Sequence, residues 1–251
     1  MRERRWIDML IAIWGRDGTG KSALSDALGG QLAKRSVTAI LDTDLTQPTL
    51  PMRVNGKKLA GDASLGKAIS GGITGGIAHY LHRHPRRKSL FYAGLTDTDE
   101  YMTYEIGLEA KDAAQDFISQ CAGLADTVIL DLSGQRTDPF IPCALARAEK
   151  VIVLITPDVQ GVCWFNAVKP LLEAMNAQGR VLPVAAMVDH HAVDAVEKIL
   201  DLRFAAELPY VRELRQIQDT GADPLDGTTR AAARYAKQVR KLCGLLKEVG
   251  T

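Results

Sequence analysis

The sequence lacks any apolar run that approaches the roughly 18 residues needed to span a membrane. It also lacks an excess of charge of either sign, since 31 Lys and Arg residues stand against 30 Asp and Glu residues for a formal net charge of +1. Overall charge therefore gives no reason to expect DNA or a membrane surface as a partner, and either contact would need a local basic patch. A content of 46% hydrophobic and 24% charged residues is typical of a globular protein with a full core.

Cysteine is scarce, and its spacing excludes several kinds of site. The four cysteines (Cys121, Cys143, Cys163 and Cys243) are far apart and form no C-x-x-C pair. This spacing predicts neither a zinc site nor a disulfide framework. It also argues against a metal-centre chaperone, which would use closely spaced cysteines. We therefore expect a reduced, cytoplasmic protein.

Short apolar runs alternate with amphipathic stretches along the whole chain. The apolar runs predict strands at 6–14, 37–41, 89–92, 127–130, 151–155, 181–188 and 203–207. Helical periodicity predicts helices at 22–34, 110–121, 139–146, 159–175, 192–200 and 228–248. Apolar strands separated by helices indicate an α/β fold with a doubly wound, mainly parallel sheet and helices on both faces. With no repeat and no low-complexity linker, residues 1–251 are expected to form a single domain.

A phosphate-binding loop is predicted at 15–22, where the sequence GRDGTGKS fits G-x-x-x-x-G-K-[ST] between an apolar strand and a helix. Gly18 and Gly20 let backbone N–H groups approach phosphate oxygens, and the following helix directs its positive end at the same anion. Lys21 supplies a charge for the β- and γ-phosphates, and the Ser22 hydroxyl is the expected Mg²⁺ ligand. The expected ligands are thus ATP or ADP with Mg²⁺. The predicted contact residues are Gly15, Asp17, Gly18, Thr19, Gly20, Lys21, Ser22 and Ala23.

Three aspartates follow predicted strands, where the carboxyl ends of a parallel sheet gather ligand-binding groups. Asp42 and Asp44 follow the second strand, and Asp131 follows the strand at 127–130. Asp131 is the candidate for a water-bridged contact to Mg²⁺, and Asp44 the candidate for orienting an attacking water near the metal. Each is alternatively a strand-end or capping aspartate. Asp42 is the weaker candidate, because neighbouring strand residues point to opposite faces.

Taken together, these segments resemble the MinD/ParA-like ATPases, which carry a deviant Walker motif. The likeness is carried by residues 15–22, 41–50 and 128–134. Further on, residues 150–158 resemble the family's strand after switch II, and Leu208-Pro-Tyr210 resembles its turn beside the nucleotide base. The resemblance implies a dimer that encloses two nucleotides and hydrolyses ATP slowly, with Pro209 near the base. It places Lys21, Asp44 and Arg16 in the catalytic set.

The sequence departs from the family pattern in the loop itself. Arg16 stands where the family has a lysine that reaches the partner subunit's phosphates, and Asp17 stands where it has glycine. A guanidinium keeps the charge and can grip a phosphate through two hydrogen bonds. Asp17 adds negative charge beside the phosphates. These departures put dimer-dependent hydrolysis in doubt but not nucleotide binding, so slow turnover at most is expected.

Base recognition also departs from the family pattern. Asp189 follows the strand at 181–188, where the family often has asparagine. A carboxylate can accept from the adenine amino group or from the N1 and N2 hydrogens of guanine, so ATP follows from the resemblance and not from Asp189. The adjacent His190 and His191 have no third ligand spaced for a metal and are expected in a surface loop.

The predicted function is an ATP-dependent dimerisation switch that localises a pilus, secretion, division or DNA-partition assembly through a protein partner. We expect it in the cytoplasm or at the inner face of the membrane. Arg16 fits the CpaE/TadZ-like branch, whose Walker motifs are degenerate, although that branch's usual receiver-like domain is not found in this sequence. Two alternatives stay open. A small-molecule kinase would use Arg83, Arg86 and Arg87 as a lid, with Asp42 and Asp44 binding the acceptor. A scaffold would bind nucleotide without turnover.

Two basic segments are ambiguous. Residues 71–88 contain four glycines followed by the basic run 82–88, and an insertion or mobile segment is expected there. The basic run is either a solvated loop or a contact for anionic lipid, DNA or an acidic partner. The helix predicted at 228–248 has an apolar face bordered by basic residues. Such a helix either packs on the sheet or lies on a membrane surface.

Overall fold

The computed structural model describes residues 9–54, 59–100, 104, 106, 110–189 and 193–247. Within them an eight-stranded sheet has the strand order β3-β4-β2-β5-β1-β6-β7-β8. The strands are β1 Met9–Gly15, β2 Thr38–Asp42, β3 His82–Arg83, β4 Leu90–Ala93, β5 Thr127–Asp131, β6 Lys150–Ile155, β7 Val181–Val188 and β8 Ala206–Pro209. Every pairing is parallel except that of β3 with β4. The predicted α/β fold class is therefore confirmed.

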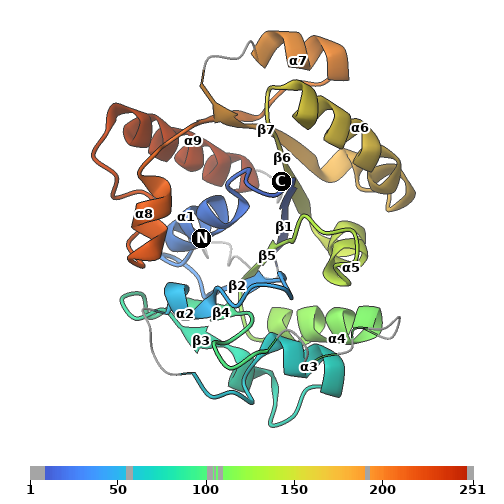
Figure 1. Cartoon of the computed structure of the whole chain (residues 1–251), viewed down its shortest axis with the longest axis vertical. Helices are drawn as coiled ribbons and strands as arrows, with labels where there is room; N and C mark the ends of the chain where they lie inside the picture. The colour runs from blue at the N-terminus through green and yellow to red at the C-terminus, as the bar shows by residue number, and fades with distance from the viewer. Residues whose placement is uncertain are drawn as a thin grey trace, which may run out of the picture.

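Helices cover both faces of this sheet. They are α1 Lys21–Leu32, α2 Leu50–Arg53, α3 Leu65–Gly71, η1 Ile77–Tyr80, α4 Ala110–Ala122, α5 Phe140–Arg147, α6 Val159–Ala174, η2 Gln178–Arg180, α7 Val193–Leu200, α8 Leu214–Asp219 and α9 Arg230–Lys247. Figure 1 shows α1, α8 and α9 on one side and α4, α5 and α6 on the other. Among the described residues, no helix combines the length and apolarity that crossing a membrane would require.

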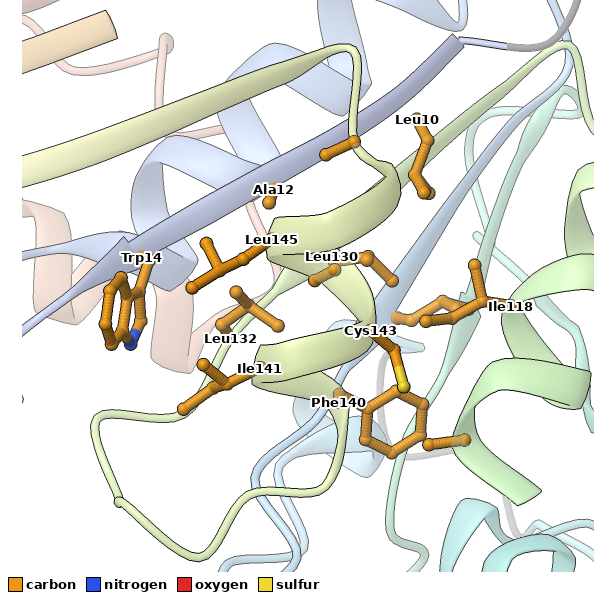
Figure 2. Packing of buried hydrophobic residues seen from close by; sticks show 14 of the residues in the cluster. Leu10, Ala12, Trp14, Ile118, Leu130, Leu132, Phe140, Ile141, Cys143 and Leu145 are labelled. Atoms are coloured by element: carbon orange, nitrogen blue, oxygen red, sulfur yellow. The ribbon is translucent and has the colours of Figure 1, made fainter. Parts of the chain in front are cut away.

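The central strand β1 contributes side chains to both faces, and this alternation builds two cores. Leu10, Ala12 and Trp14 pack against α4 and α5 on one face, as Figure 2 shows for the α5 residues that meet them. Ile11 and Ile13 belong to the second core, beneath α1 and α9. A strand buried on both faces needs a continuous apolar run, which explains the pattern in the sequence. The start of the predicted strand, residues 6–8, lies outside the described residues.

The last helix, α9, packs its apolar face onto the protein. Tyr235, Val239, Leu242 and Leu246 are buried in the same core as α1 and β8. Of the two alternatives for this amphipathic helix, the structure shows packing on the sheet.

One predicted strand had the wrong bounds, and one segment predicted as irregular contains short elements. The expected strand at 203–207 begins at Ala206 and continues to Pro209, because Arg203 and Phe204 instead bond to Glu197 of α7. The segment 71–88, expected to be an insertion or mobile, contains η1 and the antiparallel edge strand β3. It is anchored by the buried Tyr80, whose ring packs edge-on against that of Phe117 at a centroid distance of 5.8 Å.

The turn between β3 and β4 depends on a neutral histidine. His84 Nδ1 accepts hydrogen bonds from the backbone N–H groups of Arg86 at 3.0 Å and Arg87 at 3.1 Å. Burial and the charges of Arg87 and Arg86 lower the pKa of His84 to about 4. These hydrogen bonds fix the turn within the basic run, and Arg87 also forms an ion pair with Asp223, in the segment between α8 and α9.

This turn predicts a specific acid sensitivity. The unfolded chain protonates His84 near its ordinary pKa of 6.5, whereas the folded chain resists protonation down to about 4. The free energy of unfolding therefore falls as pH drops through this window. In His84→Asn the amide oxygen can accept the same two hydrogen bonds without titrating, so we expect a smaller loss. Urea unfolding of both proteins at about pH 7 and about pH 4.5 checks this. Equal losses would refute it.

Candidate functional site

The predicted phosphate loop lies between the end of β1 at Gly15 and the start of α1 at Lys21. Gly18 and Gly20 have φ angles of 78° and 85°, in the left-handed region that favours glycine. Gly20 occupies the N-cap position of α1, and no side chain caps that helix. The first N–H groups of α1 are therefore left for an anion. Thr19 closes the loop by donating from Oγ1 to the Arg16 carbonyl at 2.7 Å.

A cavity of about 650 Å³ opens above this loop. The loop and the start of α1 contribute Asp17, Gly18, Gly20, Lys21, Ser22 and Ala23 to its lining. Asp42, Asp44 and Asp131 line it from the ends of β2 and β5. The structure therefore brings the predicted loop and all three predicted aspartates around one cavity, at the carboxyl edge of the sheet.

At the predicted base-recognition site, the cavity is lined by neighbours of the predicted residues. Among the described residues that line the cavity, Met187 and Tyr210 stand near the predicted positions, and Asp189 and Pro209 are not included. Met187 has a positive φ of 56° and lies at an irregularity in the pairing of β7 with β8. A β-bulge re-aims side chains in this way, and the sequence carries no clear signal for it. His190 and His191 lie outside the described residues.

Lys21 is held by two acceptors of its own loop. Its Nζ lies 3.2 Å from the Arg16 carbonyl oxygen and 3.2 Å from Asp17 Oδ1. The same Asp17 oxygen accepts the Gly134 N–H at 3.2 Å, so Asp17 links the phosphate loop to the segment after β5. The Lys21 side chain is only 9% exposed, whereas that of Asp17 is 75% exposed. An anion entering the cavity therefore competes with Asp17 for this lysine.

Arg16 points away from the cavity that its own loop forms. Its Nη1 donates to Gln160 Oε1 at 2.6 Å and its Nη2 donates to Thr156 Oγ1 at 3.4 Å. Both partners lie at or just before the start of α6. The Arg16 Nε is buried without a hydrogen-bond partner. The residue predicted to reach a second subunit thus faces a different direction from Lys21.

Asp42 and Asp131 are neighbours across β2 and β5, and both contact a residue that the sequence analysis missed. They are register partners with side chains 8% and 2% exposed. Arg53 Nη2 lies 2.5 Å from Asp131 Oδ2 and 3.5 Å from Asp42 Oδ2. Asp42 also accepts from the Thr49 hydroxyl. Burial raises the pKa of Asp42, and the Arg53 charge opposes that rise.

Two hydrogen-bonded links join the loop after β2 to the loop after β5. In the first, the Thr43 hydroxyl donates to Asp138 Oδ2 at 2.5 Å, and the same oxygen accepts the Ser133 N–H at 3.1 Å. Burial raises the pKa of Asp138 to about 7.

The second link runs from the predicted catalytic carboxylate. Asp44 Oδ1 accepts from the Thr46 hydroxyl at 2.5 Å, and Gln135 Nε2 donates to Thr46 Oγ1 at 3.2 Å. Side-chain hydrogen bonds therefore connect the two loops at two points.

The described residues include no cluster of three or more His, Cys, Asp or Glu side chains arranged for a metal ion. Mg²⁺ at a phosphate site takes most of its ligands from phosphates and water, and only one or two from the protein. Ser22 lines the cavity and fits this role. Asp131 lines the same cavity, but its Oδ2 is engaged by Arg53.

Two of the three arginines proposed for a kinase lid have different surroundings in the structure. Arg83 lies over the Phe91 ring at 5.6 Å from its centroid. Arg87 lines a second cavity of about 390 Å³, which adjoins the first and shares Ser22 with it. Of the arginines that line this second cavity, Arg53 and Arg215 were not predicted.

No protein-family model matches the chain, and no curated protein matches its sequence. Solved structures do share its fold. The MinD cell division protein of Aquifex aeolicus is 19% identical with a TM-score of 0.73, covering 94% of this chain and 97% of its own. MinD of Pyrococcus horikoshii in complex with Mg-ADP is 15% identical with a TM-score of 0.76, covering 97% and 99%. A plasmid partition protein of Borrelia burgdorferi bound to AMPPNP is 13% identical with a TM-score of 0.74, covering 94% and 99%.

At these identities the likeness establishes the fold. It confirms the predicted resemblance to MinD/ParA-like ATPases at that level, while the CpaE/TadZ-like branch stays a prediction.

The contact between Asp17 and Lys21 predicts that the charge of Asp17 lowers the affinity of this loop for ATP. In Asp17→Asn the amide oxygen can still accept the Gly134 N–H, but the charge beside the phosphates is removed. We expect the affinity for ATP with Mg²⁺ to rise about threefold, a modest gain because Asp17 is exposed. In Lys21→Ala it should fall about 100-fold, because charge-assisted hydrogen bonds to phosphate are lost. Calorimetric titration measures both, with the exposed Lys34→Ala as control. Unchanged or weaker binding by Asp17→Asn would contradict the competition.

Proposed function

We propose that this chain, which has the fold of the MinD/ParA ATPases, binds ATP with Mg²⁺ above residues 15–22 and acts as a nucleotide-dependent dimerisation switch. One observation carries the proposal. The phosphate loop opens on a cavity of about 650 Å³ that is also lined by the two loops following β2 and β5. The neighbours in complex with Mg-ADP and AMPPNP support the choice of nucleotide.

Each step rests on this chain's own residues. The first turn of α1 and Lys21 hold the β- and γ-phosphates, and Lys21 exchanges Asp17 for the nucleotide. Ser22 holds Mg²⁺, which offsets phosphate charge when it is bound. Asp44 orients the attacking water. Thr43 and Thr46 are hydrogen-bonded to the loop after β5. A γ-phosphate that contacts one loop therefore positions both loops. ADP lacks this phosphate, so the protein distinguishes ATP from ADP.

The surface that closes on a second subunit includes Arg16. Its guanidinium is directed to Gln160 and Thr156 rather than to its own cavity. From there it contacts the partner's phosphates, in place of the lysine found in the related ATPases. Asp17 opposes the charge that gathers on closure, so turnover is slow. A protein partner recognises the closed dimer, in the cytoplasm or at the inner membrane face, and the switch localises a pilus, secretion, division or DNA-partition assembly.

One observation favours a second candidate, a small-molecule kinase. The adjoining cavity of about 390 Å³ shares Ser22 with the nucleotide cavity and is lined by Arg87 and Arg215. An anionic acceptor there would lie next to the transferred phosphate.

The decisive test is the solution mass by light scattering without nucleotide, with ADP and Mg²⁺, and with ATP and Mg²⁺, while phosphate release is followed. The switch predicts a dimer only with ATP. Arg16→Ala should bind ATP but stay monomeric, whereas Arg147→Ala, which changes an exposed arginine of α5, should behave as the wild type. A mass that never changes would contradict the switch. Turnover that then requires a hydroxyl-bearing acceptor would favour the kinase, and binding without turnover a scaffold.

A further inference from the structure

Arg53, the last residue of α2, lies among three carboxylates that come from three different elements. Its Nη2 is 2.5 Å from Asp131 Oδ2 and 3.5 Å from Asp42 Oδ2, and its Nη1 is 3.4 Å from Asp26 Oδ1. The Arg53 side chain is 7% exposed, and those of the aspartates range from 2% to 14%. Below the guanidinium lies the Tyr92 ring, with its centroid at 5.7 Å. We call these four charged residues the Arg53 cluster.

The Arg53 cluster holds more negative than positive charge when its carboxylates are ionised. Buried charges are costly unless they are paired, and one guanidinium cannot neutralise three carboxylates. Burial accordingly raises the pKa of Asp26 to about 6, with Arg53 opposing the rise. The pairing is also incomplete, because Asp26 Oδ1 and Arg53 Nη1 are buried without a hydrogen bond. The cluster therefore attracts cations more strongly than one guanidinium can satisfy.

The Arg53 cluster adjoins the position where the nucleotide's metal is expected. Asp131 lines the nucleotide cavity together with Ser22, the residue that fits Mg²⁺. Arg53 and Asp26 line the adjoining cavity of about 390 Å³. Arg53 thus contacts Asp131 and also lines this second cavity, which offers space for a displaced guanidinium.

We propose that Arg53 is a resident cation that takes the place of a divalent metal at Asp131, and that the guanidinium and Mg²⁺ compete for this carboxylate. Because of this competition, Mg²⁺ strengthens the binding of nucleotide less than it would if Asp131 were free. This consequence rests on the proposed function, whereas the competition itself does not. A purely structural Arg53 would stabilise the fold but would leave the response to Mg²⁺ unchanged.

The first test uses MgCl₂ alone. The thermal unfolding midpoint is measured for the wild type and for Arg53→Gln as MgCl₂ is added, against KCl of equal ionic strength. We expect Mg²⁺ to raise the midpoint of Arg53→Gln by about 3 °C more than that of the wild type, because the Asp131 carboxylate is then free to bind the metal. Arg147→Gln is the control, since Arg147 is an exposed arginine of α5 that lines neither cavity. It should respond as the wild type does.

The second test measures the ATP dissociation constant with Mg²⁺ and with EDTA. The dissociation constant in EDTA divided by that in Mg²⁺ should be at least about tenfold larger for Arg53→Gln than for the wild type. This corresponds to about 1.4 kcal/mol more binding free energy contributed by the metal. If Arg53→Gln does not fold, Asp26→Asn combined with Arg53→Gln removes one buried charge and serves instead. Equal responses to Mg²⁺ in both tests would overturn the proposal. If no variant binds ATP, the proposed function fails, and the MgCl₂ midpoints still decide the role of Arg53.

Discussion

The structure of the site at the carboxyl edge of the sheet depends on how two nearly buried cationic side chains are paired with carboxylates. Lys21 is held by Asp17, and Arg53 is held by Asp26, Asp42 and Asp131. In a protein interior such charges must be paired, and a carboxylate is the partner that the chain itself can provide. We propose that a phosphate replaces Asp17 and that a metal ion replaces Arg53. Both cations thus have partners within the chain that a ligand can exchange.

The topology explains why these groups meet. β1 lies between β5 and β6, and β2 lies beside β5, all parallel. The phosphate loop and the loops after β2 and β5 consequently leave the sheet at the same edge. The hydrogen bonds from Thr43 to Asp138 and from Gln135 to Thr46 then join two of those loops. Exchange of partners at either cation thus acts on a connected set of loops.

Sequence patterns were sufficient where a single segment determines the structure. The apolar runs of β1, β2, β5 and β6 predicted strands buried on both faces, and the glycine spacing at 15–22 predicted a loop that needs positive φ at Gly18 and Gly20. The gathering of Asp42, Asp44 and Asp131 followed from the parallel order of the strands. Whether these residues bind nucleotide and metal stays a prediction.

Features that depend on contacts between distant segments were not predictable. Arg53 lies in a four-residue helix without periodicity, and Asp26 reads as an ordinary polar residue of α1. Their pairing appears only when α1, β2, β5 and α2 are packed together. The edge strand β3 has two residues, too few for an alternating pattern. Met187 depends on a bulge, which places it in the cavity lining in the region where Asp189 was expected.

The central claim is that nucleotide and metal replace the internal ion-pair partners at this edge and thereby change the positions of the loops after β2 and β5. Amide hydrogen exchange with and without a non-hydrolysable ATP analogue and Mg²⁺ tests it most directly. The account predicts altered exchange in three separate segments, residues 15–22, 43–54 and 131–139, with little change in α4 and α7. A change confined to residues 15–22 would contradict the coupling between the loops, and no change in any of the three segments would contradict the site itself.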